Sequence, residues 1–330
     1  MKKLLLCLLI ITTFLGCNKE NKTIDEPKKL EEVSIVLDWY PNAVHSFIYN
    51  AVEKGYFKDE GIDLKILYPS SVSDSLTLPA AKKADMGIYY LNNIIMAKTN
   101  ENIPVKAFGA VLQRSVNTII SLKNKNINSP KDFKGKIAGT SGGALSDAYL
   151  STMMESDGAQ YEDVQVIDVG FELLTSMITN QVDFTIGGMV NHEIPVMKDK
   201  GLDINYFLVD EYGIPTAYEL ILVANEDLLK TKKETYQKVL RAFNKGFNDM
   251  KNDPDGSLKL LLSKQEADQF PLTESVEKQS LDILLPLMET ENAPFLSQKK
   301  EVWENNINWL YDKKIINKKL PPETFFINLN

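Results

Sequence analysis

Short apolar runs rich in β-branched residues alternate along this chain with longer stretches whose apolar residues recur every three to four positions. The first pattern is typical of strands and the second of amphipathic helices. The first predicted strands are 33–37, 61–67, 85–90 and 105–111, and the helices between them are 43–54, 73–83 and 93–99. Strands that alternate with helices favour a mainly parallel α/β sheet.

The same alternation restarts after residue 117 and later gives way to helices. Predicted strands cover 118–122, 137–139, 164–169, 183–188, 206–209 and 218–224, with a helical turn at 129–136 and a helix at 144–155. Beyond about residue 231 the pattern predicts helices only, over 233–252, 257–262, 273–287 and 298–313. Two α/β units joined twice suggest two lobes with a cleft between them. Ligands of open α/β sheets bind beyond the carboxyl ends of the strands, which points to the loops 38–45, 89–93, 140–144 and 189–193.

The N-terminal segment has the pattern of a targeting signal. Lys2 and Lys3 precede an apolar run over 4–15, which at about 12 residues is too short to span a bilayer. The run ends in FLGC, with Cys17 last, which resembles a bacterial lipobox whose cysteine is lipidated. A plain secretory signal or a short membrane anchor is the alternative. We therefore expect a lipoprotein signal peptide at 1–16, followed by a polar, flexible tether at 17–32.

Composition narrows the class of protein further. With 330 residues, 44% hydrophobic and 25% charged, the chain is typical of a soluble globular protein with room for two domains. The formal charge of −8 becomes −10 without residues 1–16, from 35 basic and 45 acidic side chains, and no basic cluster suggests nucleic acid as a partner. Two cysteines and two histidines exclude a disulfide framework, a Cys-rich zinc site and haem or iron–sulfur ligation by several thiolates. We expect no metal and no cofactor.

Five stretches of the body resemble one family. They are 37–45 (LDWYPNAVH), 54–62 (KGYFKDEGI), 133–136 (FKGK), 187–193 (GGMVNHE) and 212–220 (YGIPTAYEL). Over about 33–312 the chain is similar to the NMT1/THI5-like group of ABC-transporter solute-binding proteins, and within it to lipoproteins that bind thiamine-precursor pyrimidines such as formylaminopyrimidine. The segment 54–62 also occurs in sulfonate and nitrate binders, whereas 37–45 and 191–193 are more specific.

The resemblance implies an α/β, two-lobed type II periplasmic-binding-protein fold with a ligand cleft between the lobes. Lobe 1 would comprise 33–117 and 224–330, and lobe 2 would comprise 118–223. The chain would cross between the lobes near Val116 and near Leu222. Ligand binding would close the lobes by a hinge motion.

Aromatic residues in the loops after the strands are the first candidate ligand contacts. Trp39 would stack on a planar heteroaromatic ring, with Tyr40 beside it, unless both only pack between the lobes. Tyr89 and Tyr90 are adjacent in a strand and face opposite sides, and we expect Tyr90 to reach the ligand. The resemblance adds Tyr218 from the segment 212–220.

Polar residues of two loops are the second group of candidates. Asn42 and His45 would hydrogen-bond the ligand, although a turn role for Asn42 and a capping role for His45 are the alternatives. The resemblance implies that Asn191 and Glu193 contact the ligand as well. Glu193 would accept from an exocyclic amine or a protonated ring nitrogen, unless it only pairs with Lys198.

The turn at Ser141, Gly142 and Gly143 precedes a predicted helix and is the third candidate. Backbone N–H groups at a helix start attract anions, and glycine lets a ligand approach closely. A phosphate, a carboxylate or a carbonyl oxygen would fit there, and a plain tight turn is the alternative.

The same family contains an enzyme class, the pyrimidine synthases that hold pyridoxal phosphate on a lysine next to a histidine and use a cysteine-rich segment. At the equivalent places this chain has Tyr89, Asn93 and the cysteine-free stretch 214–222. A Schiff base needs an amine, so we expect no enzyme activity.

The function predicted from the sequence is that of a monomeric solute-binding lipoprotein. It would capture a thiamine-precursor pyrimidine of the formylaminopyrimidine or hydroxymethylpyrimidine type for an ABC permease and its ATPase. Cys17 would anchor it by lipid to a membrane of the bacterial cell envelope, on the periplasmic or outer face. Another heteroaromatic such as riboflavin, or a small sulfonate, is the alternative ligand, and the scarcity of arginine in the candidate loops disfavours the sulfonate.

Overall fold

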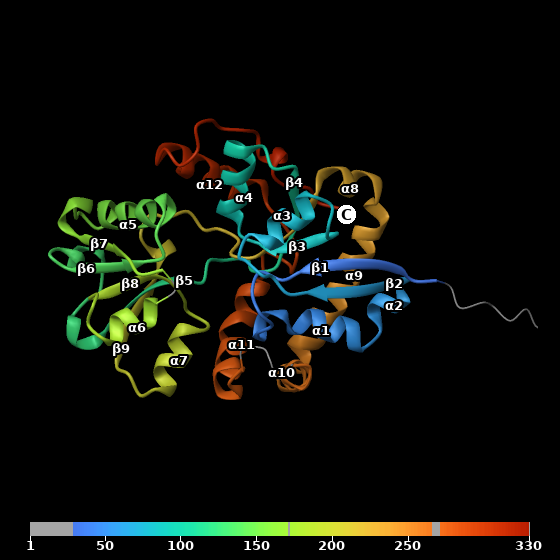
Figure 1. The fold of residues 1–330 in the computed structure, drawn as a ribbon, viewed down its shortest axis with the longest axis horizontal. Helices are drawn as coiled ribbons and strands as arrows, with labels where there is room; N and C mark the ends of the chain where they lie inside the picture. Colours follow the sequence, from blue (N-terminus) through green and yellow to red (C-terminus); the bar gives the residue numbers. More distant parts are fainter. Residues whose placement is uncertain (1–28, 171, 266–270, 330) are drawn as a thin grey trace, which may run out of the picture.

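The computed structural model describes residues 29–170, 172–265 and 271–329. These residues form two α/β lobes that lie side by side, each built on one five-stranded sheet (Figure 1). The predicted signal peptide, Cys7, Cys17 and most of the predicted tether lie outside the described residues.

The first sheet has the strand order β2-β1-β3-β10-β4. Its strands are β1 (Glu31–Val36), β2 (Ile62–Leu67), β3 (Met86–Tyr89), β4 (Val105–Ala110) and β10 (Ile221–Asn225). β1 pairs in parallel with both β2 and β3, whereas β10 runs antiparallel between β3 and β4. Because β10 comes late in the chain, its backbone completes a sheet that is otherwise formed by the first third of the chain.

The second sheet repeats this arrangement, with the strand order β7-β6-β8-β5-β9. Its strands are β5 (Asn117–Leu122), β6 (Ile137–Thr140), β7 (Gln165–Asp168), β8 (Phe184–Met189) and β9 (Ile204–Leu208). β6 is parallel to β7 and β8, and β5 is antiparallel to β8 and β9. In each sheet, therefore, the fourth strand is the one that has just crossed from the other lobe.

Helices surround both sheets (Figure 1). Those of the first lobe are α1 (Ser46–Glu53), α2 (Tyr56–Asp59), α3 (Asp74–Ala80), α4 (Leu91–Glu101), α8 (Glu226–Thr231), α9 (Lys233–Asn252), α10 (Pro254–Ser263), α11 (Glu274–Met288) and α12 (Lys300–Asp312). Those of the second lobe are α5 (Ala144–Ser156), α6 (Leu173–Ile178) and α7 (Glu193–Asp199). Among the described residues, no helix is both long enough and apolar enough to cross a membrane.

Close packing of α9 on α1 anchors the core of the first lobe. The buried residues of α9 recur at helical spacing and are Tyr236, Val239, Ala242, Phe243, Gly246, Phe247 and Met250. A Cβ atom at Gly246 would lie 2.1 Å from the carbonyl oxygen of Phe47 in α1, so only glycine allows the two helices to approach this closely.

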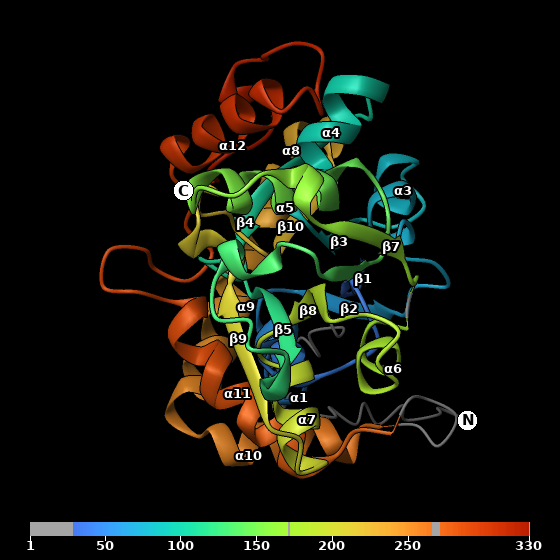
Figure 2. The ribbon, with the colours of Figure 1, turned by 90° about the vertical axis from the view of Figure 1, so that its left-hand side faces the viewer.

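The two lobes contact each other on two flanks, one at α11 and one at α12, which lie near the bottom and at the top of Figure 2. On one flank α7 packs against α11, where Asn191 Nδ2 donates to Ser280 Oγ at 3.1 Å. On the other flank Tyr149 of α5 stacks on Trp309 of α12, with ring centroids 5.3 Å apart, and the Trp309 indole N–H donates to Thr152. The loops after β1 and β3 belong to the first lobe, and the loops after β6 and β8 belong to the second, so both lobes contribute candidate loops.

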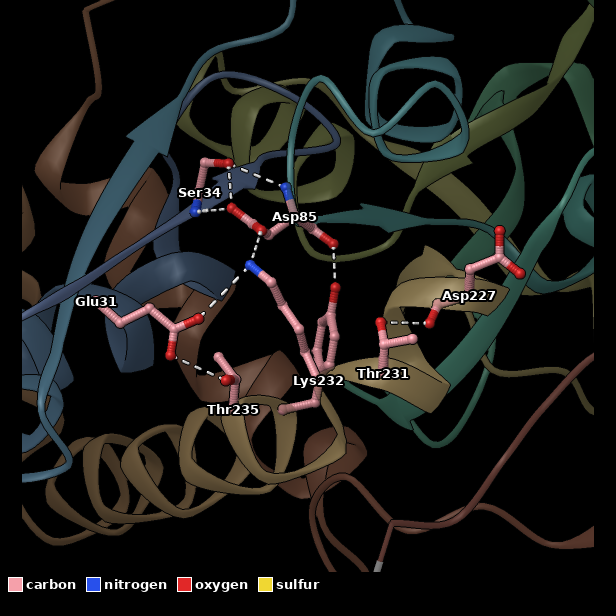
Figure 3. A network of polar contacts seen from close by, with 8 residues as sticks. Glu31, Ser34, Asp85, Asp227, Thr231, Lys232 and Thr235 are labelled. Atoms are coloured by element: carbon pink, nitrogen blue, oxygen red, sulfur yellow. Dashed lines mark hydrogen bonds and ion pairs between the residues drawn. The ribbon is translucent and has the colours of Figure 1, made fainter.

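A polar network ties β1 and the start of β3 to the start of α9 (Figure 3). Asp85 Oδ2 accepts from both the backbone N–H and the hydroxyl of Ser34, each at 2.9 Å. Lys232 lies between Glu31 and Asp85, at 3.5 Å and 3.7 Å from their carboxylates. This network is at the opposite end of the strands from the candidate loops and has a structural role.

The structure corrects several predicted details of the fold. Each sheet is mixed rather than mainly parallel, because the two crossing strands enter antiparallel, and hydrophobic periodicity carries no information on strand direction. β1 begins at Glu31, so the last two residues of the predicted tether pair with β2. β10 begins at Ile221 and pairs within the first sheet, so the chain returns before the predicted lobe boundary at 223/224. The helix predicted at 43–54 is divided into a 3-10 turn (Ala43–His45) and α1.

Candidate functional site

The loop after β1 is fixed by its own side chains. Asn42 Oδ1 accepts from the backbone N–H of Val44 at 3.1 Å, and the backbone N–H of Asn42 donates to His45 Nδ1 at 3.2 Å. The other ring nitrogen of His45, Nε2, therefore carries the proton and donates to Asp38 at 2.9 Å. This capping box, which includes a fully buried imidazole, holds the loop at the carboxyl end of β1.

This geometry decides two of the predicted ligand contacts. His45 is 0% exposed and uses both ring nitrogens within the loop, so the predicted hydrogen bond to a ligand is replaced by its alternative, the capping role. Asn42 likewise caps the turn, and its Nδ2 donates to the carbonyl of Tyr40. Trp39, by contrast, is 44% exposed, with the Tyr40 ring edge-on to it at 6.0 Å. The loop thus presents aromatic surface rather than the polar groups predicted for it.

The end of β3 places two tyrosines at the lobe boundary. Tyr89 is 8% exposed, whereas Tyr90 is only partly buried and contacts both hydrophobic clusters of the molecule. Burial raises the pKa of the Tyr90 hydroxyl, and the nearby carboxylates of Asp38 and Glu219 raise it further. Tyr90 therefore lies close to acidic groups of the β1 loop and of the second crossing between the lobes.

The glycine turn after β6 opens toward solvent. Gly142 and Gly143 have φ angles of 79° and 89°, which other residues rarely adopt, and a Cβ at Gly143 would meet no atom within 4 Å. A Cβ at Gly142, however, would lie 2.5 Å from the Asp168 carboxylate. Ser141 is exposed beside this turn. An anionic ligand group at Gly142 would face the negative charge of Asp168.

The loop after β8 contacts the first lobe. Glu193 Oε2 accepts from the backbone N–H of Met189 at 2.6 Å, and Glu193 Oε1 lies 3.0 Å from His192 Nδ1. The hydrogen bond to Glu193 raises the pKa of His192, which the buried carboxylate of Glu277 on α11 raises further. Glu193 thus binds groups of its own loop instead of pairing with Lys198, which was the alternative to the predicted ligand contact. Asn191 bridges to Ser280 across the lobes as described above.

The two chain crossings between the lobes meet at Glu219, which sequence reasoning did not single out. Its carboxylate accepts from the Ser115 hydroxyl at 2.6 Å and from the Val116 backbone N–H at 3.0 Å. Burial raises the pKa of Glu219, and these hydrogen bonds offset the effect only in part. The segment 212–220 contains Glu219, but only the fold shows that its carboxylate binds the other crossing.

Tyr218, next to Glu219, does not face the candidate site. Its side chain is 3% exposed, and its hydroxyl accepts from the Lys299 backbone N–H at 2.7 Å. Its ring packs against Trp303 of α12. The predicted ligand contact of Tyr218 is therefore replaced by a structural role, because its ring and its hydroxyl are both engaged by the segment that contains α12.

The four candidate loops carry negatively charged side chains but no lysine or arginine. The loops 38–45, 89–93, 140–144 and 189–193 contain the carboxylates of Asp38 and Glu193 and no lysine or arginine. Within the described residues, no group of three or more His, Cys, Asp or Glu side chains is placed to hold a metal ion. The arrangement therefore offers aromatic surface and hydrogen-bond acceptors, which suits a planar ligand that carries N–H donors.

Two surface hollows of the described chain lie away from these loops. They follow the outer strand β9 and are lined by Leu122, Lys123, Asn124 and Asp203 in one case and by Asn128, Ile204, Asn205, Tyr206 and Phe207 in the other. Neither contains a predicted site residue, and both are open to solvent.

The fold is that of the periplasmic binding proteins, which confirms the predicted fold class. The alkanesulfonate-binding protein SsuA from Xanthomonas axonopodis pv. citri, solved with bound MOPS, matches with a TM-score of 0.68 over 91% of this chain and 99% of that chain, at 12% identity. The aliphatic sulphonate binding protein SsuA from Escherichia coli matches with a TM-score of 0.70 over 89% and 96% of the two chains, at 14% identity. The chain belongs to the NMT1/THI5-like family, whose profile matches residues 42–257, and the predicted family is thereby confirmed.

Relatives within this family include both binders and enzymes. The formylaminopyrimidine-binding protein of Halalkalibacterium halodurans is 38% identical over 306 residues, which are 93% of this chain and 92% of that protein. The 4-amino-5-hydroxymethyl-2-methylpyrimidine phosphate synthase of Schizosaccharomyces pombe is 25% identical over 232 residues, 68% of this chain and 66% of that protein. The sequence is thus more similar to the binding protein, and over a larger share of the chain.

Proposed function

We propose that this protein is a solute-binding protein that captures a pyrimidine precursor of thiamine, of the formylaminopyrimidine type, between its two lobes. The observation that carries the proposal is the exposed indole of Trp39 among loops that offer acceptors and no cationic side chain other than histidine. An aminopyrimidine is planar, stacks on an indole and donates through its amine. The similarity to a formylaminopyrimidine-binding protein over almost the whole chain supports the same ligand class.

A sulfonate ligand, suggested by the fold relatives, is less compatible with these loops. A sulfonate group presents only acceptor oxygens and a negative charge, which arginine or several free backbone donors would have to meet. The glycine turn at Gly142 is the one backbone candidate for such donors, and the carboxylate of Asp168 lies beside it. Riboflavin, another flat heteroaromatic, remains the second candidate because Trp39 would stack on its ring as well.

We infer that the protein binds its ligand without converting it. Tyr89 stands where the pyrimidine synthases carry the lysine that holds pyridoxal phosphate, and it is almost fully buried. Asn93 stands where they carry the histidine, and 214–222 contains no cysteine. Incubation with pyridoxal phosphate and iron should therefore yield no pyrimidine above a heat-killed control.

We also propose that the protein delivers its ligand to an ABC permease while anchored by lipid at Cys17. The signal-like segment ending at Cys17 supports this, together with a fold shared with periplasmic binding proteins. Mass spectrometry of the membrane fraction should detect a diacylglyceryl cysteine at the mature N-terminus. An unmodified protein secreted into the medium would contradict the anchor.

A calorimetric titration tests the proposed ligand. We expect binding of formylaminopyrimidine and of 4-amino-5-hydroxymethyl-2-methylpyrimidine, and no heat with taurine. Riboflavin is the comparison for other heteroaromatics, and a thermal-shift series provides an independent readout because ligand binding stabilises the folded state. Tight binding of taurine with no response to either pyrimidine would refute the proposal.

A further inference from the structure

A cluster of acceptor atoms lies where the two chain crossings meet. Glu219 accepts from Ser115 and Val116 of the other crossing, and no lysine, arginine or histidine of the described chain pairs with it. Arg114, next to Ser115 in the chain, pairs instead with Asp210 at 3.0 Å. The Glu219 carboxylate therefore has hydrogen-bond donors for support but no positive charge to neutralise it.

Asn92 of α4 carries a second acceptor that the protein leaves unused. Its side chain is 5% exposed, and its Nδ2 donates to the Tyr149 hydroxyl at 3.0 Å across the lobe boundary. Its Oδ1 is buried and has no hydrogen-bond partner. Asn117, the first residue of β5, likewise has a buried Oδ1 without a partner. An unpartnered buried oxygen costs about 1–3 kcal/mol, so such atoms in one region require an explanation.

These groups belong to one site rather than to separate places. Ile221 of β10 pairs with Tyr89 of β3, so Glu219, two residues before Ile221, and Asn92, three residues after Tyr89, lie at the same edge of the first sheet. Asn92 in turn donates to Tyr149 of the second lobe. Asn117 follows Val116, whose backbone N–H binds Glu219. The cluster thus combines α4 of the first lobe, α5 of the second lobe and both crossings.

We propose that Glu219 and the unused carbonyl of Asn92 form the specificity wall of the ligand site and receive the N–H groups of an exocyclic amine. This inference rests on the proposed function and identifies the exocyclic amine as the ligand group that determines specificity. An amino group presents two N–H donors, whereas an oxo group at the same ring position presents only lone pairs. An oxo ligand would leave these acceptors unpaired and face the negative charge of Glu219, so the wall selects amino over oxo pyrimidines.

The test is a titration with two probes, 4-amino-5-hydroxymethyl-2-methylpyrimidine and its 4-oxo counterpart. The wild-type protein should bind the amino compound about 10- to 150-fold more tightly, the range for a hydrogen bond to a charged group. In Glu219→Gln the side-chain carbonyl can still accept from Ser115 and Val116. The new N–H₂ group cannot accept from the ligand's amine, but it can donate to an oxo group at the same position. The preference should therefore vanish or reverse in this variant.

Controls separate recognition from structure. Glu226 pairs with the buried Lys98 at the far end of the first sheet, so Glu226→Gln should keep the amino preference even where its melting temperature falls. Asn92→Ala provides a second variant, independent of Glu219. It should reduce the ratio by which the protein binds the amino compound more tightly than the oxo compound. A merely structural role would weaken both probes equally and leave their ratio unchanged.

Each outcome decides between the two proposals. If the wild type prefers the amino compound and both Glu219→Gln and Asn92→Ala keep the full preference, the specificity wall is refuted and the proposed function stands. Equal binding of both probes by the wild type also refutes the wall alone. Failure of the wild type to bind either pyrimidine refutes the proposed function and the wall with it.

Discussion

Trp39 is the most exposed of the three tryptophans of this chain. Its residue surface is 44% exposed, against 0% for Trp303 and 9% for Trp309, which both belong to α12. This exposed indole lies in the loop beyond the carboxyl end of β1, where ligands of open α/β sheets bind. Because the other two indoles are shielded, Trp39 also provides a selective optical probe of the site.

Replacement of Trp39 by alanine should weaken pyrimidine binding without unfolding the protein. Loss of a stacked indole removes about 1–3 kcal/mol, or roughly 5- to 150-fold in affinity. In the wild type, ligand should protect the exposed fluorescence from acrylamide quenching. Tyr311→Ala is the matched control, since Tyr311 is 42% exposed on α12, and it should bind as the wild type does. Unchanged affinity in a folded Trp39→Ala protein would place the site elsewhere.

His192 should make the stability of the α7 region depend on pH. Its pKa is raised above 6.5, chiefly by the hydrogen bond to Glu193, so the folded state favours the protonated ring. The resulting stabilisation is complete below the unfolded value near 6.5 and is lost as pH rises through the raised folded value. Urea unfolding between about pH 5.5 and about pH 8.5 should show a smaller loss of stability in His192→Gln than in the wild type. Parallel pH profiles for the two proteins would contradict this.

At the residue scale, sequence patterns located the candidate loops but not the direction of each side chain. Trp39 is exposed and Tyr90 is only partly buried, so their predicted ligand contacts stay predictions, whereas His45 and Tyr218 are buried and engaged with protein groups. Both were candidates because of their neighbours in the chain. Whether a polar side chain caps its own turn or faces outward depends on a few backbone angles, which residue order does not encode. The role of Glu219 depends on two distant segments and was invisible for the same reason.

At the element scale, the partly buried side chain of Asp85 joins two neighbouring strands. It holds Ser34 of β1 through two hydrogen bonds, and its own backbone N–H donates back to the Ser34 hydroxyl at 3.0 Å (Figure 3). Lys232, at the start of α9, adds an ion pair to the same carboxylate. One residue thus sets the register of β1 against β3 and the position of a long helix.

Asp85→Ala should therefore lower the free energy of unfolding by about 1–3 kcal/mol, because it leaves the two Ser34 donors without their acceptor and Lys232 with Glu31 alone. Urea denaturation measures this, and ligand affinity should stay unchanged because the network is far from the candidate loops. Asp227→Ala is the control. The Asp227 carboxylate forms a solvent-exposed ion pair with Lys82, so the free energy of unfolding should not change measurably. Equal midpoints for the two variants would show that the Asp85 network contributes nothing.

The strands were the most predictable elements because each is a short apolar run bounded by turn residues. All ten described strands lie within three residues of their predicted limits, from β1 to β10. The short helices α2, α6, α7 and α8 were missed, since four to seven residues hold too few turns for a helical period to emerge. The sequence pattern also did not predict the direction of each strand, because that direction depends on where the chain crosses between the lobes.

For the whole molecule, the contact between Asn191 and Ser280 offers a way to test lobe motion. Thiols placed at both positions, with Cys7 and Cys17 replaced by serine, are close enough for a short reducible bifunctional reagent. Cross-linking after ligand is bound should slow ligand release at least about tenfold, because the lobes can no longer separate. Reduction should restore the rate, and the two single-thiol variants should show no effect. Release at the normal rate from the linked protein would mean that exchange needs no opening.

The antiparallel fourth strand of each sheet has a consequence for the order in which the chain assembles. β10 fills the place between β3 and β4, yet it emerges more than a hundred residues after them. Until then, a nascent chain ending near β5 carries two bare strand edges in an unfinished sheet, the kind of surface that pairs with other chains. Fragments that stop before residue 221 should therefore aggregate rather than fold. The same delay keeps the early chain unfolded for as long as its synthesis lasts, a state in which a polypeptide can still be threaded through a narrow channel.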